Sequence, residues 1–127
     1  MKYQDYTGPW DWENFKPEEI ACRHCGELWV DDSMPEYFKV AMDNLQKLRI
    51  LWGRPIIINS GHRCTVHNTN VGGASKSQHL KIAFDCVCPR DKQAEFCELA
   101  LEAGFNVARA YPDNGFVHLD MGRPRTW

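Results

Sequence analysis

The sequence has no long hydrophobic run. No segment approaches the roughly 20 consecutive apolar residues that a membrane-spanning helix requires, and the start of the chain, MKYQDYTGPWDWENF, lacks the apolar core of a secretory signal. These two absences predict a protein that does not insert into a membrane and is made in the cytoplasm without a signal peptide.

The sequence also lacks a large excess of charge of either sign. The formal net charge is −2, so the chain has no general electrostatic attraction to nucleic acid or to an anionic membrane. Internal repeats and low-complexity tracts are absent as well. At 127 residues, with 43% hydrophobic side chains, the chain can bury a core without disulfides. We expect residues 1–127 to form one monomeric domain that binds no nucleic acid, with an aromatic-rich irregular segment at about residues 1–30.

Cysteine is better represented, at positions 22, 25, 64, 86, 88 and 97. Without an export signal, we expect free thiols. The run Cys22-Arg23-His24-Cys25 is half of a structural zinc site, and a complete site would need two more ligands, such as Cys64 with Cys86, Cys88 or His67. Because no second paired motif has ligand spacing, the simpler interpretation is a set of thiols in an irregular loop.

The pattern of apolar residues predicts an α+β fold. A single helical turn is expected after Lys16-Pro17-Glu18-Glu19. A long amphipathic helix should begin at Ser33-Met34-Pro35-Glu36, capped by Ser33, and end before Gly53. A second helix over residues 91–103 should be capped by Asp91. The predicted strands cover residues 55–59, 82–87, 107–110 and 116–121, with a long polar loop over residues 60–79 and a turn over residues 112–115.

Three polar residues suggest a metal site. Side chains alternate along the last strand, so Phe116, His118 and Asp120 share one face. Asp85 lies within an apolar strand, where an uncompensated carboxylate is costly. With His79 and His118 it would supply three zinc ligands and leave a fourth position for water, as in catalytic zinc sites. The alternative is that both histidines are ordinary polar residues and Asp85 pairs with an arginine.

A wider pattern resembles the M15 family of zinc D-Ala-D-Ala carboxypeptidases and related phage endolysins. The resemblance runs from about Phe15 to Trp127. Its motifs are Ser60-Gly61-His62-Arg63, Asn68, Val71-Gly72-Gly73-Ala74-Ser75-Lys76-Ser77-Gln78-His79, Ala83-Phe84-Asp85 and Phe116-Val117-His118-Leu119-Asp120. It implies a small antiparallel sheet packed against a long helix and a second helix, with the zinc site on the open sheet face, as in hedgehog and DD-peptidase folds.

The resemblance also assigns residues. It implies that His79, Asp85 and His118 bind one catalytic zinc ion, that Arg63 holds a substrate carboxylate or carbonyl, and that Ser77 hydrogen-bonds the substrate. An arginine fork suits the free carboxylate at the end of a peptide stem, because it donates two parallel hydrogen bonds. The alternative for Arg63 is a surface salt bridge, which contributes little stability.

Two departures from the family pattern concern the chemistry. Relatives have a glycine between the first histidine and the aspartate, whereas His79-Leu80-Lys81-Ile82-Ala83-Phe84-Asp85 lacks it and is one residue shorter. We expect the bend before Ile82 to absorb this loss, because a loss within the strand would turn Asp85 to the other face. Relatives often place a general base three residues before the last histidine, where this chain has Gly115. Asp120 is the favoured replacement, with Asp113 as the alternative, and Asp120 could instead orient a ligand.

The resulting expectation is a zinc metallopeptidase that hydrolyses an amide bond in the peptide stems of peptidoglycan. Its specificity would be that of a D-Ala-D-Ala carboxypeptidase or an L-Ala-D-Glu endopeptidase. A phage or prophage endolysin that reaches the cell wall or periplasm after the membrane is breached fits this expectation. The alternatives are a catalytically inactive, zinc-containing cell-wall-binding module of the same fold, and a cysteine-rich structural zinc protein.

Overall fold

The structure, a computed structural model, describes residues 1–74 and 77–123. Ser75 and Lys76 of the glycine-rich motif, and the end of the predicted domain at residues 124–127, lie outside these described residues.

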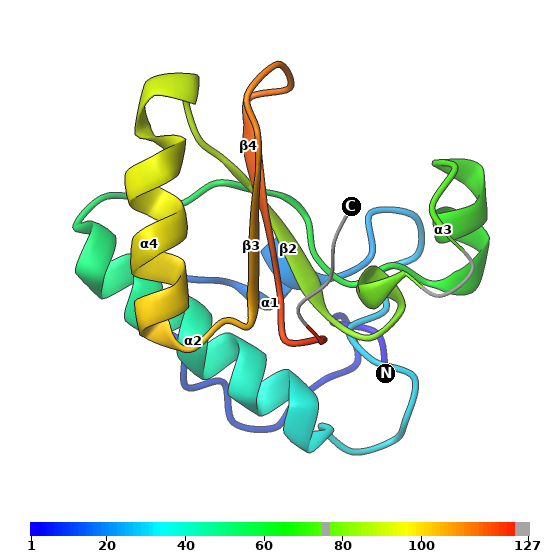
Figure 1. Ribbon diagram of the computed structural model, residues 1–127. Coiled ribbons are helices and arrows are strands. Elements are labelled where there is room, and N and C mark those ends of the chain that lie inside the picture. Colours follow the sequence, from blue (N-terminus) through cyan, green and yellow to red (C-terminus); the bar gives the residue numbers. More distant parts are fainter. Residues whose placement is uncertain (75–76, 124–127) are drawn as a thin grey trace.

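A four-stranded antiparallel sheet positions the polar residues singled out above. Its strands are β1 (Ile58–Ser60), β2 (Ala83–Val87), β3 (Val107–Tyr111) and β4 (Phe116–Asp120), arranged in the order β1-β2-β4-β3 (Figure 1). The central pair, β2 and β4, aligns Asp85 with His118 and Phe84 with Leu119. Because side chains alternate along each strand, Asp85 and His118 emerge on one face, whereas Phe84 and Leu119 are fully buried in the core.

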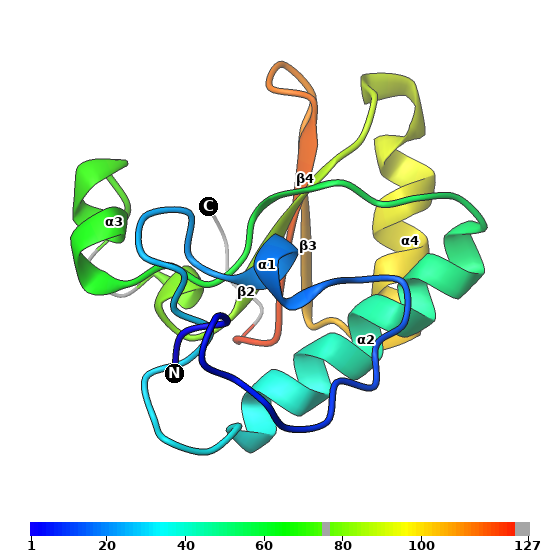
Figure 2. The same cartoon turned by 180° about the vertical axis from the view of Figure 1, so that it is seen from behind.

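Two helices cover the apolar face of this sheet. Helix α2 (Glu36–Trp52) buries one stripe of side chains and ends at Gly53, whose φ of 72° is the left-handed conformation that favours glycine at this position. Helix α4 (Gln93–Ala103) packs against α2 and against β3 and β4. Figures 1 and 2 show these two helices on one side of the sheet and α3 (Thr65–Asn70) on the other. The predicted α+β class, with a small antiparallel sheet and two packed helices, is confirmed.

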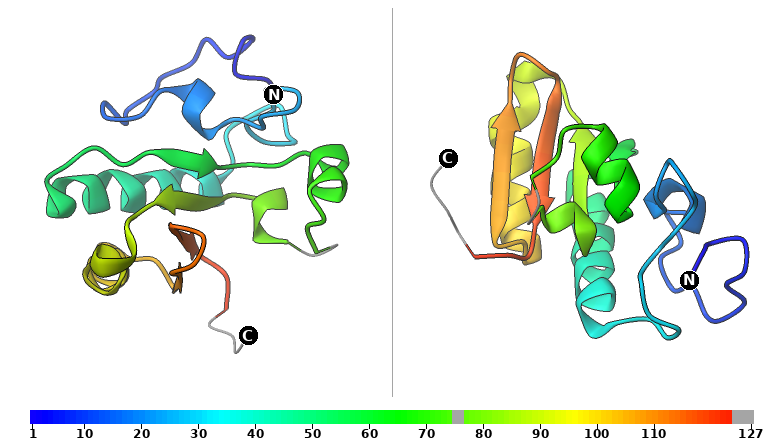
Figure 3. Two further views of the ribbon diagram at one scale, coloured as in Figure 1. Left: turned by 90° about the horizontal axis from the view of Figure 1, so that it is seen from above. Right: turned by 90° about the vertical axis from the view of Figure 1, so that its right-hand side faces the viewer.

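The N-terminal segment completes the core. It contains α1 (Pro17–Ile20), which contacts β1, and an isolated bridge between Lys2 and Glu27, and it runs along the outer side of the domain (Figure 3). Trp29 is fully buried and packs edge-on against Phe38 of α2, with ring centroids 4.8 Å apart. Trp12, Phe15 and Trp29 of this irregular segment therefore belong to the main core, and Tyr3, Tyr6 and Trp10 pack against it.

Several predicted boundaries were wrong for local reasons. The N-cap of α2 is Pro35, without a side-chain cap, so Ser33 does not cap it. Asp91 lies inside a 3-10 turn, η2 (Arg90–Lys92), which runs into α4, so the chain enters that helix already turned and Asp91 cannot act as its cap. Strand β1 begins three residues later than predicted, and the predicted loop contains α3 and a 3-10 turn, η1 (Gln78–Leu80).

None of the helices in residues 1–74 and 77–123 is both long and apolar enough to cross a membrane.

Candidate metal centre

Three elements bring His79, Asp85 and His118 together. His79 comes from η1, Asp85 from β2 and His118 from β4, and one ligand atom from each lies within 4.8 Å of the others. Oδ2 of Asp85 is 3.3 Å from Nε2 of His79, and Oδ1 is 2.9 Å from Nδ1 of His118. All three side chains are largely buried. The structure therefore places the three predicted ligands in one cluster.

Hydrogen bonds on the far side of each imidazole define its orientation. Nδ1 of His79 lies 2.7 Å from the carbonyl oxygen of Gly61, which can only accept, so this nitrogen carries the proton. Nε2 of His118 lies 2.6 Å from Oδ2 of Asp120. Each ring thus directs its other nitrogen, Nε2 of His79 and Nδ1 of His118, toward Asp85, which is how protein groups commonly fix the tautomer of a metal-binding histidine.

The cluster has acceptors that face one another. Nε2 of His79 is buried and makes no hydrogen bond. When His118 is neutral and its proton is on Nε2, its Nδ1 presents a lone pair to the Asp85 carboxylate at 2.9 Å. Lone pairs and a negative charge converging in a buried space require a cation or an extra proton. Two imidazole nitrogens and one carboxylate oxygen are suitable zinc ligands, so these residues fit a zinc ion.

The pKa shifts describe how the cluster balances without a metal. Burial acts to raise the pKa of Asp85, but its hydrogen bond with His118 and its close approach to Nε2 of His79 outweigh this effect and hold the pKa well below the usual 3.8. Burial acts to lower the pKa of His118, but its hydrogen bonds to Asp120 and Asp85 raise that pKa above 6.5. A proton on His118 therefore supplies the positive charge that a metal ion would otherwise supply.

Arg63 and Ser77 line the same cleft, which has a volume of about 680 Å³. Nη2 of Arg63 is 3.6 Å from Oδ2 of Asp85, while Nε donates to Ser60 and Nη1 to Oδ1 of Asn68. Ser60 and Asn68 thus fix the orientation of the guanidinium group, which stands beside the cluster of His79, Asp85 and His118. The side-chain oxygen of Ser77 accepts from the backbone N–H of His79 at 3.2 Å, which places it at the start of η1.

The two candidate general bases occupy different environments. Asp120 is buried behind His118, and its Oδ1 accepts from the backbone N–H of Gly122 at 2.8 Å. Asp113 lies on the exposed turn between β3 and β4, where it pairs with Arg90 at 3.2 Å. Neither belongs to the described lining of the cleft, where Asp85 is the one carboxylate.

The bend before β2 leads Asp85 to the face predicted for it. The turn η1 ends at Lys81, whose backbone φ of −97° and ψ of −90° lie outside the regular helix and strand regions. The chain then enters β2 with Asp85 opposite His118 and its carboxylate directed at both histidines. The shortened spacing therefore does not turn Asp85 away from the cluster.

Some contributors to the site were not expected from the sequence. Tyr111 and Phe116, at the turn end of the β3–β4 hairpin, stack with ring centroids 4.6 Å apart and line the cleft. The alternation on β4 had placed Phe116 on the same face as His118, but Tyr111 is paired with it only by the hairpin register.

Asn68 was part of the quoted motif without a role, and the structure gives it one. Its side chain is buried, accepts from Nη1 of Arg63 and donates to the carbonyl of Ala74.

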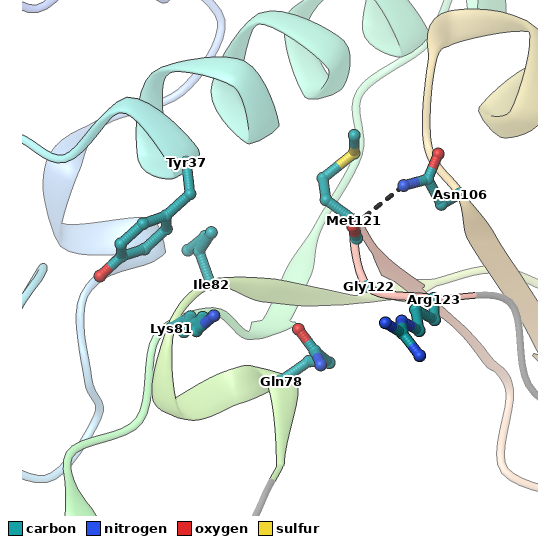
Figure 4. A pocket seen from close by; sticks show the side chains of 8 residues that line it. All are labelled: Tyr37, Gln78, Lys81, Ile82, Asn106, Met121, Gly122 and Arg123. Carbon is teal, nitrogen blue, oxygen red and sulfur yellow. Dashed lines mark hydrogen bonds between the residues drawn. The ribbon is translucent and has the colours of Figure 1, made fainter.

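A second cavity, of about 510 Å³, adjoins the cleft. Figure 4 shows its lining, in which Asn106 donates to the carbonyl oxygen of Met121 at 3.0 Å. Gln78 lines both cavities, so both border η1.

Comparison with known proteins gives the class of this chain. It matches the Peptidase M15 family over residues 13–120, a range that contains every residue of the metal cluster. The chain belongs to the Peptidase M15 family. It is also similar to the zinc D-Ala-D-Ala carboxypeptidase of Streptomyces albus G, with 34% identity over 93 residues, which are 69% of this chain and 36% of that protein. The chain thus spans about a third of the length of this curated relative.

Proposed function

We propose that this protein is a zinc metallopeptidase that hydrolyses an amide bond in the peptide stems of peptidoglycan. The observation that carries the proposal is the convergence of His79 Nε2, His118 Nδ1 and the Asp85 carboxylate on one buried point beside an open cleft. Membership of the Peptidase M15 family and the similarity to a zinc D-Ala-D-Ala carboxypeptidase support this substrate class.

The chain supplies three zinc ligands and keeps them in position. His79 would bind through Nε2, because its Nδ1 donates to Gly61, and His118 through Nδ1, because its Nε2 faces Asp120. A zinc ion with an open fourth position lowers the pKa of a bound water to about 7 and polarises a carbonyl group. Asp85 would offset one unit of the metal's charge. Its Oδ2 also lies 3.6 Å from Nη2 of Arg63, so the proposed substrate-binding group stands directly beside the zinc ligands.

Arg63 and Ser77 form the proposed substrate side of the cleft. Two of the guanidinium nitrogens are already held by Ser60 and Asn68, so the group is oriented before substrate arrives. Such preorganisation reduces the entropy lost on binding. A stem-peptide carboxylate or carbonyl would accept from the remaining N–H groups of Arg63. The cleft, which the aromatic pair of the hairpin lines, and the second cavity would together accommodate an extended peptide.

We assign Asp120 a positioning role toward His118. Its Oδ2 accepts from Nε2 of His118 at 2.6 Å while Gly122 fixes its other oxygen. A buried carboxylate in this arrangement sets the tautomer of the histidine and makes Nδ1 a stronger ligand. The assignment differs from a general-base role in one measurable way: loss of Asp120 should weaken metal binding and not only slow the reaction.

The finer part of the proposal is a lysis role, in which the protein acts on the cell wall as a phage or prophage endolysin. It is supported by the resemblance of the sequence motifs to phage endolysins. Expression in a bacterium together with a membrane-permeabilising protein tests it, because lysis should require both proteins and an intact metal cluster.

The proposed activity is tested by incubating the zinc-loaded protein with purified peptidoglycan and analysing the products by mass spectrometry. Loss of a terminal alanine from stem peptides indicates carboxypeptidase cleavage. Release of stems that begin at D-Glu indicates endopeptidase cleavage. His118→Ala, which removes a ligand, should abolish either product.

Binding to peptidoglycan without any product would contradict hydrolysis and favour the inactive binding module. The matched control is Arg90→Ala. Arg90 is exposed and forms an ion pair with Asp113, so its replacement should leave product formation unchanged.

A further inference from the structure

A second cluster of metal-binding side chains lies in the N-terminal part of the domain. Sγ atoms of Cys22, Cys25 and Cys64 all lie within 4.8 Å of one another. Cys22 and Cys25 belong to the loop that follows α1, and Cys64 precedes α3. The fold thus brings together cysteines that are 42 positions apart in the chain.

The loop that carries Cys22 and Cys25 has a defined backbone. The N–H of Cys22 donates to the carbonyl of Glu27, and the N–H of Gly26 donates back to the carbonyl of Cys22, both at 2.8 Å. Gly26 has a φ of 83°, which a side chain would disfavour. This tight turn holds both sulfurs on the same side without a metal, so the ligands are preorganised.

Backbone N–H groups already surround the sulfurs. Sγ of Cys22 lies 3.4 Å from the N–H nitrogens of His24 and of Cys64, and Sγ of Cys64 lies 3.4 Å from that of His67. Donors of this kind stabilise negative charge on sulfur. If these three cysteines ionise, their negative charges need a cation, and a single disulfide would use two of the sulfurs and leave the third.

A candidate fourth ligand, His67, lies on α3, outside the group of three mutually close cysteines. Cys64 is the N-cap of this helix and His67 is its third residue, two positions whose side chains can approach each other. The pairs Cys22-x-x-Cys25 and Cys64-x-x-His67 then form two matched half-sites. The ring of His67 stacks on that of His24, with centroids 6.0 Å apart, which keeps it beside the cysteine loop.

We propose that Cys22, Cys25, Cys64 and His67 hold a second zinc ion with a structural role. Three thiolates and one imidazole form a closed tetrahedral set, which is typical of structural zinc and leaves no position for substrate. The ion fastens the N-terminal segment to the loop before α3. That loop also carries Arg63, the neighbour of Cys64, so the second zinc steadies the substrate side of the cleft.

The test is a metal titration of the reduced full-length protein. Wild type should bind two zinc ions per chain by elemental analysis, and Cys25→Ser should bind one. Cys97→Ser, which removes a half-buried thiol of α4 outside the cluster, is the matched control and should still bind two. A wild type that binds one zinc ion, or a Cys25→Ser variant that still binds two, would overturn the proposal.

Cobalt substitution gives a readout that does not depend on activity or on a stable cysteine variant. Cobalt bound by thiolates absorbs in the near ultraviolet through charge transfer from sulfur, whereas a site of two histidines and an aspartate has no such band. Wild type and His118→Ala should both show this band, and its absence in cobalt-saturated wild type would refute the cysteine site. His67→Ala should change the visible cobalt spectrum, and an unchanged spectrum would exclude His67 as the fourth ligand. Because His118→Ala removes only the first site, these results stand apart from the proposed peptidase activity.

Discussion

At the scale of single residues, the buried carboxylate of Asp120 contacts Nε2 of His118 and is proposed to set the tautomer of that histidine. We predict that Asp120→Asn weakens zinc affinity by about 10- to 100-fold, because the amide replaces a charged acceptor of the Nε2 proton of His118. Competition with a chromophoric chelator measures the affinity, and steady-state kinetics of the zinc-saturated variant show whether the catalytic rate recovers.

Asp113→Asn is the comparison for this variant. Asp113 is exposed and paired with Arg90, so its loss should change neither zinc affinity nor the catalytic rate. If Asp120→Asn binds zinc as wild type does but loses its catalytic rate, Asp120 acts as the general base and the positioning role is wrong. A large loss of rate in Asp113→Asn would instead identify that residue as the base.

Arg63 gives a second residue-scale prediction. Arg63→Ala should keep its zinc but lose kcat/KM by about 30-fold or more, which corresponds to about 2 kcal/mol of lost transition-state binding. Arg63→Lys should recover little, because an ammonium group cannot reproduce the two-pronged contact or the simultaneous bonds to Ser60 and Asn68. Kinetics on a synthetic stem peptide and zinc analysis of the same samples check both points. Full activity in Arg63→Lys would show that Arg63 contributes only its positive charge.

At the scale of elements, Gly61 follows β1 and contacts both the N-terminal segment and η1. A Cβ atom at this position would lie 2.3 Å from the carbonyl oxygen of Ile20, a backbone atom that can move only with α1. The carbonyl of Gly61 also holds His79. We predict that Gly61→Ala destabilises the fold by about 1–3 kcal/mol and also weakens zinc binding.

Gly115→Ala separates the packing effect from the conformational one. Gly115 has a φ of 71° and nothing within 4 Å of an added Cβ, so the substitution should cost about 1–2 kcal/mol and leave zinc affinity unchanged. Chemical denaturation and chelator competition measure the two quantities. Equal effects of both substitutions on zinc affinity would show that Gly61 does not position His79.

At the scale of the whole molecule, pH should change what zinc contributes to stability. The raised pKa of His118 in the metal-free protein means that its contribution is fully present below 6.5 and is lost as the pH rises through its higher folded value. The lowered pKa of Asp85 gives a contribution that is present above 3.8 and is lost only in stronger acid. Zinc must displace the proton from His118, so zinc binding should strengthen as the pH rises.

We therefore predict that the increase in Tm on adding zinc is larger at pH 8 than at pH 5.5. The measurement is thermal unfolding of metal-free and zinc-loaded protein at both values, made in Cys25→Ser so that thiol ligands do not contribute. An increase in Tm that is the same at both values, or larger at pH 5.5, would show that no proton is displaced from the histidine cluster.

Much of the architecture follows from local sequence. The apolar stripe of α2 with Gly53 at its end, and the turn between β3 and β4, are determined by neighbouring residues, because helix periodicity and turn preferences act over a few positions. The alternation on β4 likewise places His118 opposite the core. The three predicted ligands could thus be named from sequence, with the family motifs deciding between a metal cluster and ordinary polar residues.

The tertiary structure decided which side chains meet across the chain. Sequence left Asp120 as either a base or an orienting residue, and only the tertiary structure shows its 2.6 Å contact with Nε2 of His118, on which the proposed positioning role rests. Likewise, Cys22-x-x-Cys25 was half a site until packing brought Cys64 beside it. Such contacts join residues far apart in sequence, and they form because strand register and core burial bring the segments together. Local propensity carries no information about that distance, so these pairings had to come from the fold.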